Sequence, residues 1–184
     1  MNKTRNEITS AWIDGLRVVI LQDGSVEWLD GEGWYHRPDG PALLKRDGTV
    51  YWCCHGKLHR EDGPAIIYPD GRLEWWRKGR LHRDDGPAIT CTDGQMEWWY
   101  QGKRHRIDGP AVIWPDGWMT WWNDGMYHRE NGPAVIWPNG QMEWWWHGKK
   151  HREDGPAVIY PDGRAEWWEN GKRIRVVREV RQDK

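Results

Sequence analysis

Six histidines recur every 23 residues, each followed by an arginine: His36, His59, His82, His105, His128 and His151. Imidazole nitrogens bind transition metals and titrate near neutral pH, so the row suggests a metal site or a pH sensor. In stacked β-hairpins, however, equivalent positions lie about 10 Å apart, twice the strand spacing. Zinc holds its ligands about 2 Å away. We therefore expect no metal and no cofactor, and predict that each histidine packs in its turn and bonds a nearby aspartate or backbone carbonyl.

The arginines form a second row of chemically active side chains. Guanidinium groups bind phosphate and carboxylate through paired hydrogen bonds, so these residues are candidate anion contacts. Nearly every copy also carries Asp or Glu within three residues, which favours local ion pairs over an external anion. Anionic lipid or nucleotide binding stays a secondary hypothesis. The candidates are Arg60, Arg83, Arg106, Arg129 and Arg152.

The sequence contains no recognisable catalytic constellation. It lacks G-x-S-x-G, a P-loop and H-E-x-x-H, and Ser10 and Ser25 are its only serines. Catalytic groups are usually singular, whereas almost every polar residue here recurs. We therefore expect a protein that is not an enzyme.

Composition narrows the class further. The 184 residues carry a formal net charge of −1, so the chain lacks the excess of basic residues that is typical of nucleic-acid-binding proteins. We therefore expect no nucleic-acid partner. No window is apolar enough for a membrane span or a signal peptide. Cys53, Cys54 and Cys91 are odd in number and match no zinc spacing, which predicts reduced thiols in a cytoplasmic protein. The chain also has 18 Trp, which excludes disorder because Trp supplies large buried areas.

The histidines head near-copies of one phrase, in its fullest form HREDGPAVIYPDGR-x-EWW-x-x-GK. A fixed period of this length is typical of repeat architectures. In the copy starting at His59, residues 63–68 and 72–76 are strand-like, and Pro69-Asp70-Gly71 suits a three-residue hairpin loop. Residues 79–87 are polar and are predicted to form a connection without strand.

The hairpin loop sets which side chains share a face, because side chains alternate along a strand. Ala65, Ile67, Leu73 and Trp75 share an apolar face, which we call the core face. Ile66, Tyr68, Arg72, Glu74 and Trp76 share the other, which we call the mixed face. The core-face Trp is present in seven copies and is predicted to be structural: Trp28, Trp52, Trp75, Trp98, Trp121, Trp144 and Trp167.

These patterns predict an all-β fold, an elongated single-layer antiparallel meander, or solenoid, of about seven stacked 23-residue hairpins. We expect one repeat domain over residues 1–184. It comprises an N-terminal cap at 1–12, hairpin repeats at 13–172, and a capping strand and tail at 173–184. Alternating charge along the last segment is typical of an edge strand that blocks further pairing.

The phrase YPDGRLEWWRKGRLHRDDGPA resembles the bacterial variant of the MORN repeat at Tyr68, Gly71 and Gly79. The turn Gly102-Lys103-Arg104-His105 is similar to the ordinary MORN motif. The resemblance covers about residues 13–172, although this chain has an acidic insertion before Gly-Pro that the family lacks. It implies an elongated sheet of stacked hairpins and roles in scaffolding, lipid contact or toxin neutralisation. Proteins with this repeat include antitoxin components, so the resemblance suits a bacterial or phage origin.

The mixed face is the candidate binding surface, because large apolar patches usually mark contacts. The protein itself covers this face, or a second copy of the chain covers it in a homodimer, or the face binds a partner. We expect a protein partner that the chain neutralises or sequesters. The alternative is a small-ligand binder whose aromatic platforms take a glycan, a cationic ligand or a nucleotide. The candidate residues are Trp76, Trp99, Trp114, Trp122, Trp137, Trp145, Trp168, Glu74, Glu97 and Glu143.

Overall fold

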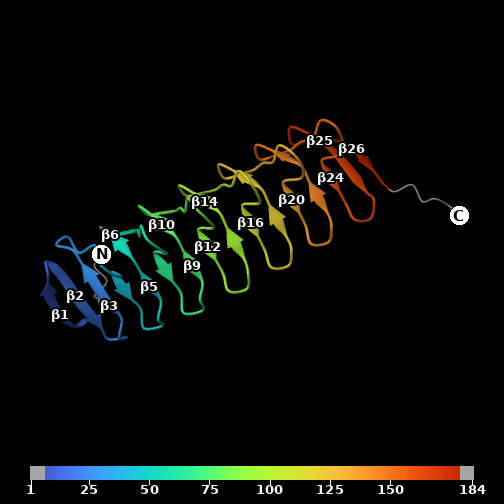
Figure 1. Ribbon diagram of the computed structural model, residues 1–184. Helices are drawn as coiled ribbons and strands as arrows, with labels where there is room; N and C mark the ends of the chain where they lie inside the picture. The colour runs from blue at the N-terminus through green and yellow to red at the C-terminus, as the bar shows by residue number, and fades with distance from the viewer. Residues whose placement is uncertain (1–6, 179–184) are drawn as a thin grey trace. The chain divides into compact units, whose positions relative to one another are not determined.

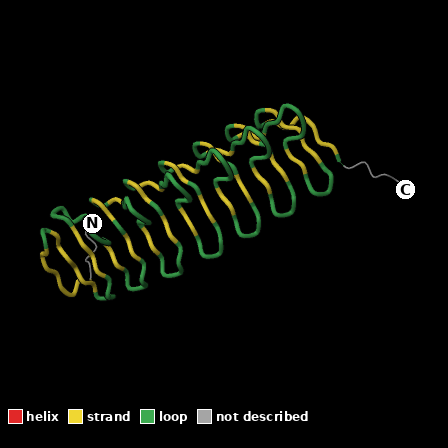
Figure 2. The backbone as a smooth tube through the Cα atoms, in the orientation of Figure 1, coloured by secondary structure: helices red, strands yellow, loops and turns green. Residues whose placement is uncertain are grey.

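The computed structural model describes residues 7–178, and the regular secondary structure in that range consists entirely of β-strands (Figures 1 and 2). The chain divides into two compact units, residues 1–92 and 93–184. The main strands of each unit form an antiparallel meander in chain order. The predicted all-β meander is therefore confirmed. Over residues 7–178 there is no helix of the length and apolar character needed to cross a membrane.

The first unit has eight main strands and two short strand pairs. The main strands are β1 (Glu7–Ile13), β2 (Leu16–Leu21), β3 (Val26–Leu29), β4 (Leu43–Leu44), β5 (Val50–Tyr51), β8 (Ile66–Ile67), β9 (Leu73–Glu74) and β12 (Ile89–Thr90). The short pairs are β6 (Cys53–Cys54) with β7 (Lys57–Leu58), and β10 (Trp76–Arg77) with β11 (Arg80–Leu81).

The second unit repeats this plan with eight main strands and three short pairs. The main strands are β13 (Met96–Glu97), β16 (Val112–Ile113), β17 (Met119–Thr120), β20 (Val135–Ile136), β21 (Met142–Glu143), β24 (Val158–Ile159), β25 (Ala165–Glu169) and β26 (Lys172–Val177). The short pairs are β14 (Trp99–Tyr100) with β15 (Lys103–Arg104), β18 (Trp122–Asn123) with β19 (Met126–Tyr127), and β22 (Trp145–Trp146) with β23 (Lys149–Lys150).

The main hairpins have the predicted register and turn. Between β8 and β9, Ile66 pairs with Glu74 and Ile67 pairs with Leu73. Gly71 takes a φ of +87° and donates its N–H to the Tyr68 carbonyl at 3.0 Å. Such a left-handed corner favours glycine, which has no Cβ to clash. An Asp or Asn side chain braces this turn by accepting the N–H two residues on, at Asp23, Asp47, Asp70, Asp93, Asp116, Asn139 and Asp162.

The predicted strandless connection is wrong, because it contains the second strand of another hairpin. β10 leads into a two-residue turn at Lys78-Gly79 and returns as β11, with Trp76 paired to Leu81. Both turn residues have positive φ, 52° and 77°, the combination found in type I′ hairpins. The short pairs extend from the main strands at one end in each unit (Figure 1). Turns with this pair of angles lie at Asp14-Gly15, His55-Gly56, Lys78-Gly79, Gln101-Gly102, Asp124-Gly125, His147-Gly148 and Asn170-Gly171.

Burial is shared between the two faces of the main strands. Ala65 of the core face is fully buried, but so are Ile66 and Glu74 of the mixed face, at 4% and 5% exposure. Ile67 and Leu73 on the core face are only half-buried. The sequence predicted that the apolar face holds the fold, whereas the structure buries residues on both faces. The short hairpins cause this difference, since they bring a second layer of side chains against the mixed face.

The terminal strands differ from the internal ones in length. β1 pairs with β2 from Glu7 to Ile13, so the described part of the predicted N-terminal cap, residues 7–12, is a strand. In the second unit β26 pairs with β25 over Lys172–Val177 and is the last strand in the order of the sheet, while its capping role stays a prediction. The rest of the two predicted caps, residues 1–6 and 179–184, lies outside the described part of the chain.

Candidate binding surface

The mixed face combines residues of the main strands with residues of the short hairpins. At Trp75 the chain leaves the main ladder, and its N–H donates to the Ala88 carbonyl at 2.8 Å. The next residue, Trp76, begins β10 and turns its indole back toward β9. Its Nε1–H donates to Glu74 Oε2 at 2.8 Å. Four repeats thus place one indole directly against the carboxylate two residues before it.

The predicted glutamates form the buried floor of the mixed face. Glu74, Glu97 and Glu143 are only 5%, 7% and 7% exposed. A buried carboxylate needs hydrogen bonds to offset its desolvation, and an indole N–H meets this need in every case. The donor–acceptor distances are 2.8 Å for Trp76–Glu74, 2.9 Å for Trp99–Glu97, 3.0 Å for Trp145–Glu143 and 2.8 Å for Trp168–Glu166.

Cations on neighbouring strands neutralise these carboxylates. Arg104 of β15 lies 3.1 Å from Glu97, and Lys150 of β23 lies 3.3 Å from Glu143. In the first unit Arg72 pairs with Glu74. Burial, and then the charge of Glu74, raise the pKa of Tyr68 to about 12, so its hydroxyl stays protonated. The glutamates are thus used within the fold, and a cationic ligand would have to displace these partners.

Aromatic rings stand in two rows on the mixed face of the second unit. Trp118 stacks between Trp114 and Trp137, with ring centroids 3.9 Å and 4.6 Å apart. In the other row Tyr127 lies between Trp122 and Trp145, at 4.0 Å and 5.2 Å. All six rings are half-buried. They present a partly exposed aromatic surface. The sequence analysis assigned four of them to the mixed face and left their exposure open.

Sequence reasoning missed Trp118 and Tyr127. Trp118 occupies the position of Arg72, opposite Trp114 across the hairpin turn, so the predicted register already placed the two side by side. Tyr127 lies in the connection equivalent to residues 79–87, which was predicted to contain no strand. Its place opposite Trp122 follows only once the second hairpin is recognised.

Two repeats lack the mixed-face glutamate and carry Tyr51 or Thr120 in its place. Thr120 replaces the glutamate, is fully buried, and accepts the Trp122 Nε1–H at 2.8 Å. The buried Nε1–H of Trp118 has no hydrogen-bond partner. The mixed face around Trp118 is therefore aromatic, with a spare donor between the rings. Charge reaches it from the neighbouring repeats, where Trp137 donates to Glu143 and Arg104 lies 5.2 Å from the Trp122 ring centroid.

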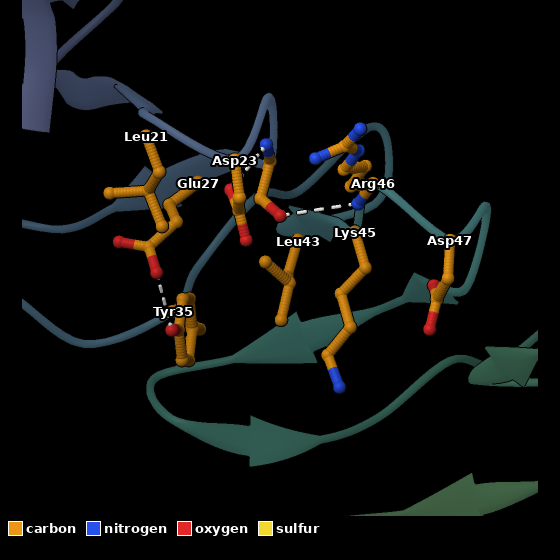
Figure 3. A pocket seen from close by; sticks show the side chains of 9 residues that line it. Leu21, Asp23, Glu27, Tyr35, Leu43, Lys45, Arg46 and Asp47 are labelled. Carbon is orange, nitrogen blue, oxygen red and sulfur yellow. Dashed lines mark hydrogen bonds between the residues drawn. The ribbon is translucent and has the colours of Figure 1, made fainter. Parts of the chain in front are cut away.

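A hollow of about 610 Å³ opens on the mixed face of the first unit (Figure 3). Leu21 and Lys45 line it where other repeats carry Tyr or Trp, and the smaller or more flexible side chains leave space. Tyr35 closes one wall by donating its hydroxyl to Glu27 at 2.7 Å. The remaining lining residues are Asp23, Ser25, Leu43, Arg46 and Asp47.

The arginine row is engaged in each repeat's own packing. The Arg60 guanidinium lies 4.1 Å from the Trp52 ring centroid and donates to the Pro64 carbonyl at 3.2 Å. Gly63 lies beneath it, where a Cβ would stand 3.0 Å from Arg60 Cζ. The other candidate anion contacts, Arg83, Arg106, Arg129 and Arg152, lie 3.9–4.2 Å from Trp75, Trp98, Trp121 and Trp144. Their planar faces are covered by indole, which is the geometry of a cation–π contact.

The histidine row ties successive repeats together. His59 Nδ1 accepts the backbone N–H of Lys78, the first residue of the next type I′ turn, at 3.3 Å. The same bond joins His36 to His55, His105 to Asp124, His128 to His147, and His151 to Asn170, at 3.2–3.3 Å. The predicted partners were a nearby aspartate or a carbonyl. The nearby carboxylate is seen at Nε2 of three histidines, where Asp84 lies 3.2 Å from His82, and Glu61 and Glu153 lie 3.8 Å and 3.9 Å from His59 and His151. The partner of Nδ1 is instead an amide N–H 19 residues on, so this ring nitrogen acts as an acceptor.

Comparison with known proteins adds little to this geometry. No protein family and no curated protein matches the chain. Among solved structures it is similar to the TCP10 domain of Danio rerio CPAP, with 20% identity, a TM-score of 0.27, and coverage of 92% of this chain and 71% of that one. The same domain with a Danio rerio STIL peptide gives 20% identity, a TM-score of 0.21, and coverage of 93% and 99%. The MORN resemblance stays a prediction.

Proposed function

We propose that this chain is a non-enzymatic binding protein whose mixed face contacts a protein partner in the cytoplasm. The observation that carries the proposal is the partly exposed double row of aromatic rings in the second unit. Aromatic residues are enriched in the central, tightly packed parts of protein interfaces. The glutamates beneath them are neutralised, so docking would not leave a buried charge unpaired. The resemblance to antitoxin components supports a partner that is neutralised or sequestered.

Replacements drawn from other repeats test the proposal. Trp118→Arg introduces the residue present at the equivalent Arg72 and Arg164, and it breaks the aromatic row. Ile107→Glu is the matched control, because Ile107 is 91% exposed in a connection and other repeats carry Glu at this position. Ile107→Glu should keep the melting temperature of the parent chain. Trp118→Arg loses two ring stacks and has no glutamate like Glu74 beside it, so its melting temperature should fall, and binding is measured well below that temperature.

The binding measurement compares immobilised parent and variant chains. A protein captured from bacterial lysate by the parent is purified and its affinity for each chain is measured. We expect Trp118→Arg to weaken binding at least tenfold and Ile107→Glu to leave it unchanged, since central aromatic contacts are worth about 2 kcal/mol or more. Equal affinity for the two variants would place the interface elsewhere on the chain.

The hollow beside Glu27 favours a second candidate function, the binding of a small ligand. A space of about 610 Å³ lies within the usual range for small-molecule sites. Lys45, Arg46 and Asp47 would supply polar contacts at its rim. Thermal shifts with panels of glycans, cationic compounds and nucleotides test this candidate, because a tight ligand raises the melting temperature by mass action. The change Leu43→Trp would fill the hollow and should abolish any such shift.

A further inference from the structure

A cluster of two imidazoles and a thiol lies where the first repeat meets the second. The potential ligand atoms of His36, Cys54 and His55 all lie within 4.8 Å of one another. His36 stands in the connection between β3 and β4, Cys54 ends β6, and His55 opens the following type I′ turn. The two imidazole rings stack, with centroids 4.1 Å apart and planes inclined by 17°.

Hydrogen bonds already fix one nitrogen of each ring. His36 Nδ1 accepts the backbone N–H of His55 at 3.2 Å. His55 Nδ1 contacts the carboxylate of Asp30 at 2.9 Å. The Nε2 atom of each ring is thus the one available to a ligand. A carboxylate behind an imidazole is the usual outer-shell arrangement of metal-binding histidines, because it orients the ring and makes it more basic.

The cluster exists because this repeat departs from the others at two positions. Pro38 stands two residues after His36, where four of the other repeats have a carboxylate, and three of those carboxylates lie within 3.9 Å of the histidine Nε2: Glu61, Asp84 and Glu153. Cys54 stands where other repeats carry Arg77, Tyr100, Asn123, Trp146 and Glu169. The first change leaves His36 Nε2 without a carboxylate, and the second places a thiol beside it.

We propose that His36, Cys54 and His55 form a site for one zinc-class metal ion, bound through the two Nε2 atoms and Sγ. A set of one thiolate and two imidazoles suits Zn²⁺, and three protein ligands leave one coordination position open. Tetrahedral bonds of 2.0–2.3 Å bring ligand atoms to about 3.5 Å from each other, which is closer than the 4.8 Å limit of the cluster, so metal binding draws the three side chains together. The His55 side chain is 70% exposed, so its ring can tilt out of the stack.

This site is compatible with the spacing argument against a shared metal in the histidine row. That argument concerns equivalent positions in successive repeats, which lie about 10 Å apart. Here His36 of one repeat contacts His55, a turn residue of the next repeat. The backbone N–H of His55 donates to His36 Nδ1, which brings the two side chains together. A matched comparison exists in the second unit. The rings of His128 and His147 lie with centroids 4.4 Å apart and planes inclined by 30°, but Trp146 replaces the thiol.

Cobalt titration of the reduced full-length chain tests the site, because a Co²⁺–thiolate bond gives a charge-transfer band in the near ultraviolet. We expect the band to saturate at one equivalent and to disappear when Zn²⁺ is added. Cys54→Ser should abolish it. His36→Asn should weaken binding at least tenfold, since its amide oxygen can still accept the His55 N–H while the Nε2 ligand is lost. Asp30→Asn should weaken binding by about tenfold, as outer-shell changes usually do.

Controls separate this site from adventitious binding. Cys91→Ser and His128→Asn should keep the band and its stoichiometry, because neither residue belongs to the cluster. Cys54→Tyr, which introduces the residue of the equivalent Tyr100, should keep the metal-free melting temperature and lose the band. The proposal is overturned if the parent chain shows no saturating band, or if the band survives in Cys54→Ser.

Discussion

At the scale of single residues, one arginine accounts for four positions of the repeated phrase. The Arg106 guanidinium lies 3.9 Å from the Trp98 ring centroid and donates to the Pro110 carbonyl at 3.2 Å. A Cβ on Gly109 would come within 2.8 Å of Arg106 Cζ. Trp, Arg, Gly and Pro are therefore coupled by one packed unit. The recurring H-R-x-x-G-P-A phrase reflects this unit and does not require an external anion.

Removing the indole from this unit should cost stability. We expect Trp98→Ala to lower the free energy of unfolding by about 3 kcal/mol, the low end for a large aromatic side chain because Trp98 is half-buried. A double-mutant cycle with Arg106→Ala should give a coupling of about 1 kcal/mol, the size of a partly buried cation–π contact. Denaturant unfolding measures both quantities, and zero coupling would show that the arginine and the indole act independently.

A second residue-scale prediction concerns pH. His128 is 8% exposed, and its Nδ1 accepts the His147 N–H, a bond that a protonated ring cannot make. Burial, and then His147, lower the pKa of His128 below its usual 6.5, with Glu130 acting weakly in the opposite sense. The unfolded chain therefore binds this proton first as the pH falls. Stability contributed by neutral His128 is complete above about pH 6.5 and is lost as the pH drops through that value toward the folded-state pKa.

Unfolding free energies measured between about pH 8 and pH 5 test this prediction. The variant His128→Asn keeps an acceptor for the turn and cannot take up a proton in this range. Its stability should change less with pH than that of the parent chain. Parallel curves for the two chains would mean that other groups cause the pH dependence.

At the scale of elements, the type I′ turns reverse the chain between the two strands of each short hairpin. Lys78 adopts a φ of 52°, which is costly for a lysine and easy for asparagine. We expect Lys78→Asn to stabilise the chain by about 0.5 kcal/mol, a gain seen as a higher melting temperature. The reverse change, Asn170→Lys at φ 49°, should destabilise by a similar amount. Loss of stability in Lys78→Asn would mean that the lysine side chain makes a contact that outweighs its backbone strain.

These turns also show where the sequence was sufficient and where it was not. Pro69-Asp70-Gly71 has strong local turn chemistry, so the main hairpin and its register could be predicted residue by residue. Lys78-Gly79 has a weak signal, because the lysine takes up its unusual conformation only with the His59 bond and the stacking of neighbouring hairpins. Missing that element also hid Tyr127 and the cations that neutralise the glutamates. The aromatic content of the mixed face was predictable, whereas its partial burial was not.

At the scale of the whole molecule, a repeat chain should tolerate loss of a complete unit. Stability in such chains is a sum of repeat and nearest-neighbour terms. Deleting residues 111–133 removes one 23-residue period and joins Pro110 to Ala134, which restores the Pro-Ala junction. We expect this chain to fold with an unchanged circular-dichroism signature. Deleting only residues 111–121 breaks the period and should cause unfolding at a clearly lower temperature, so similar curves for both chains would argue against repeat-wise stability.

The histidine bonds have a direction. Five of the histidines accept from a turn that lies 19 residues later in the chain, and all five bonds run in this sense. On the ribosome, where the N-terminal part emerges first, the acceptor of each bond is therefore made and placed before its donor. A sheet that folds in the order of its synthesis would therefore offer each of these five turns a hydrogen-bond acceptor that is already in the chain.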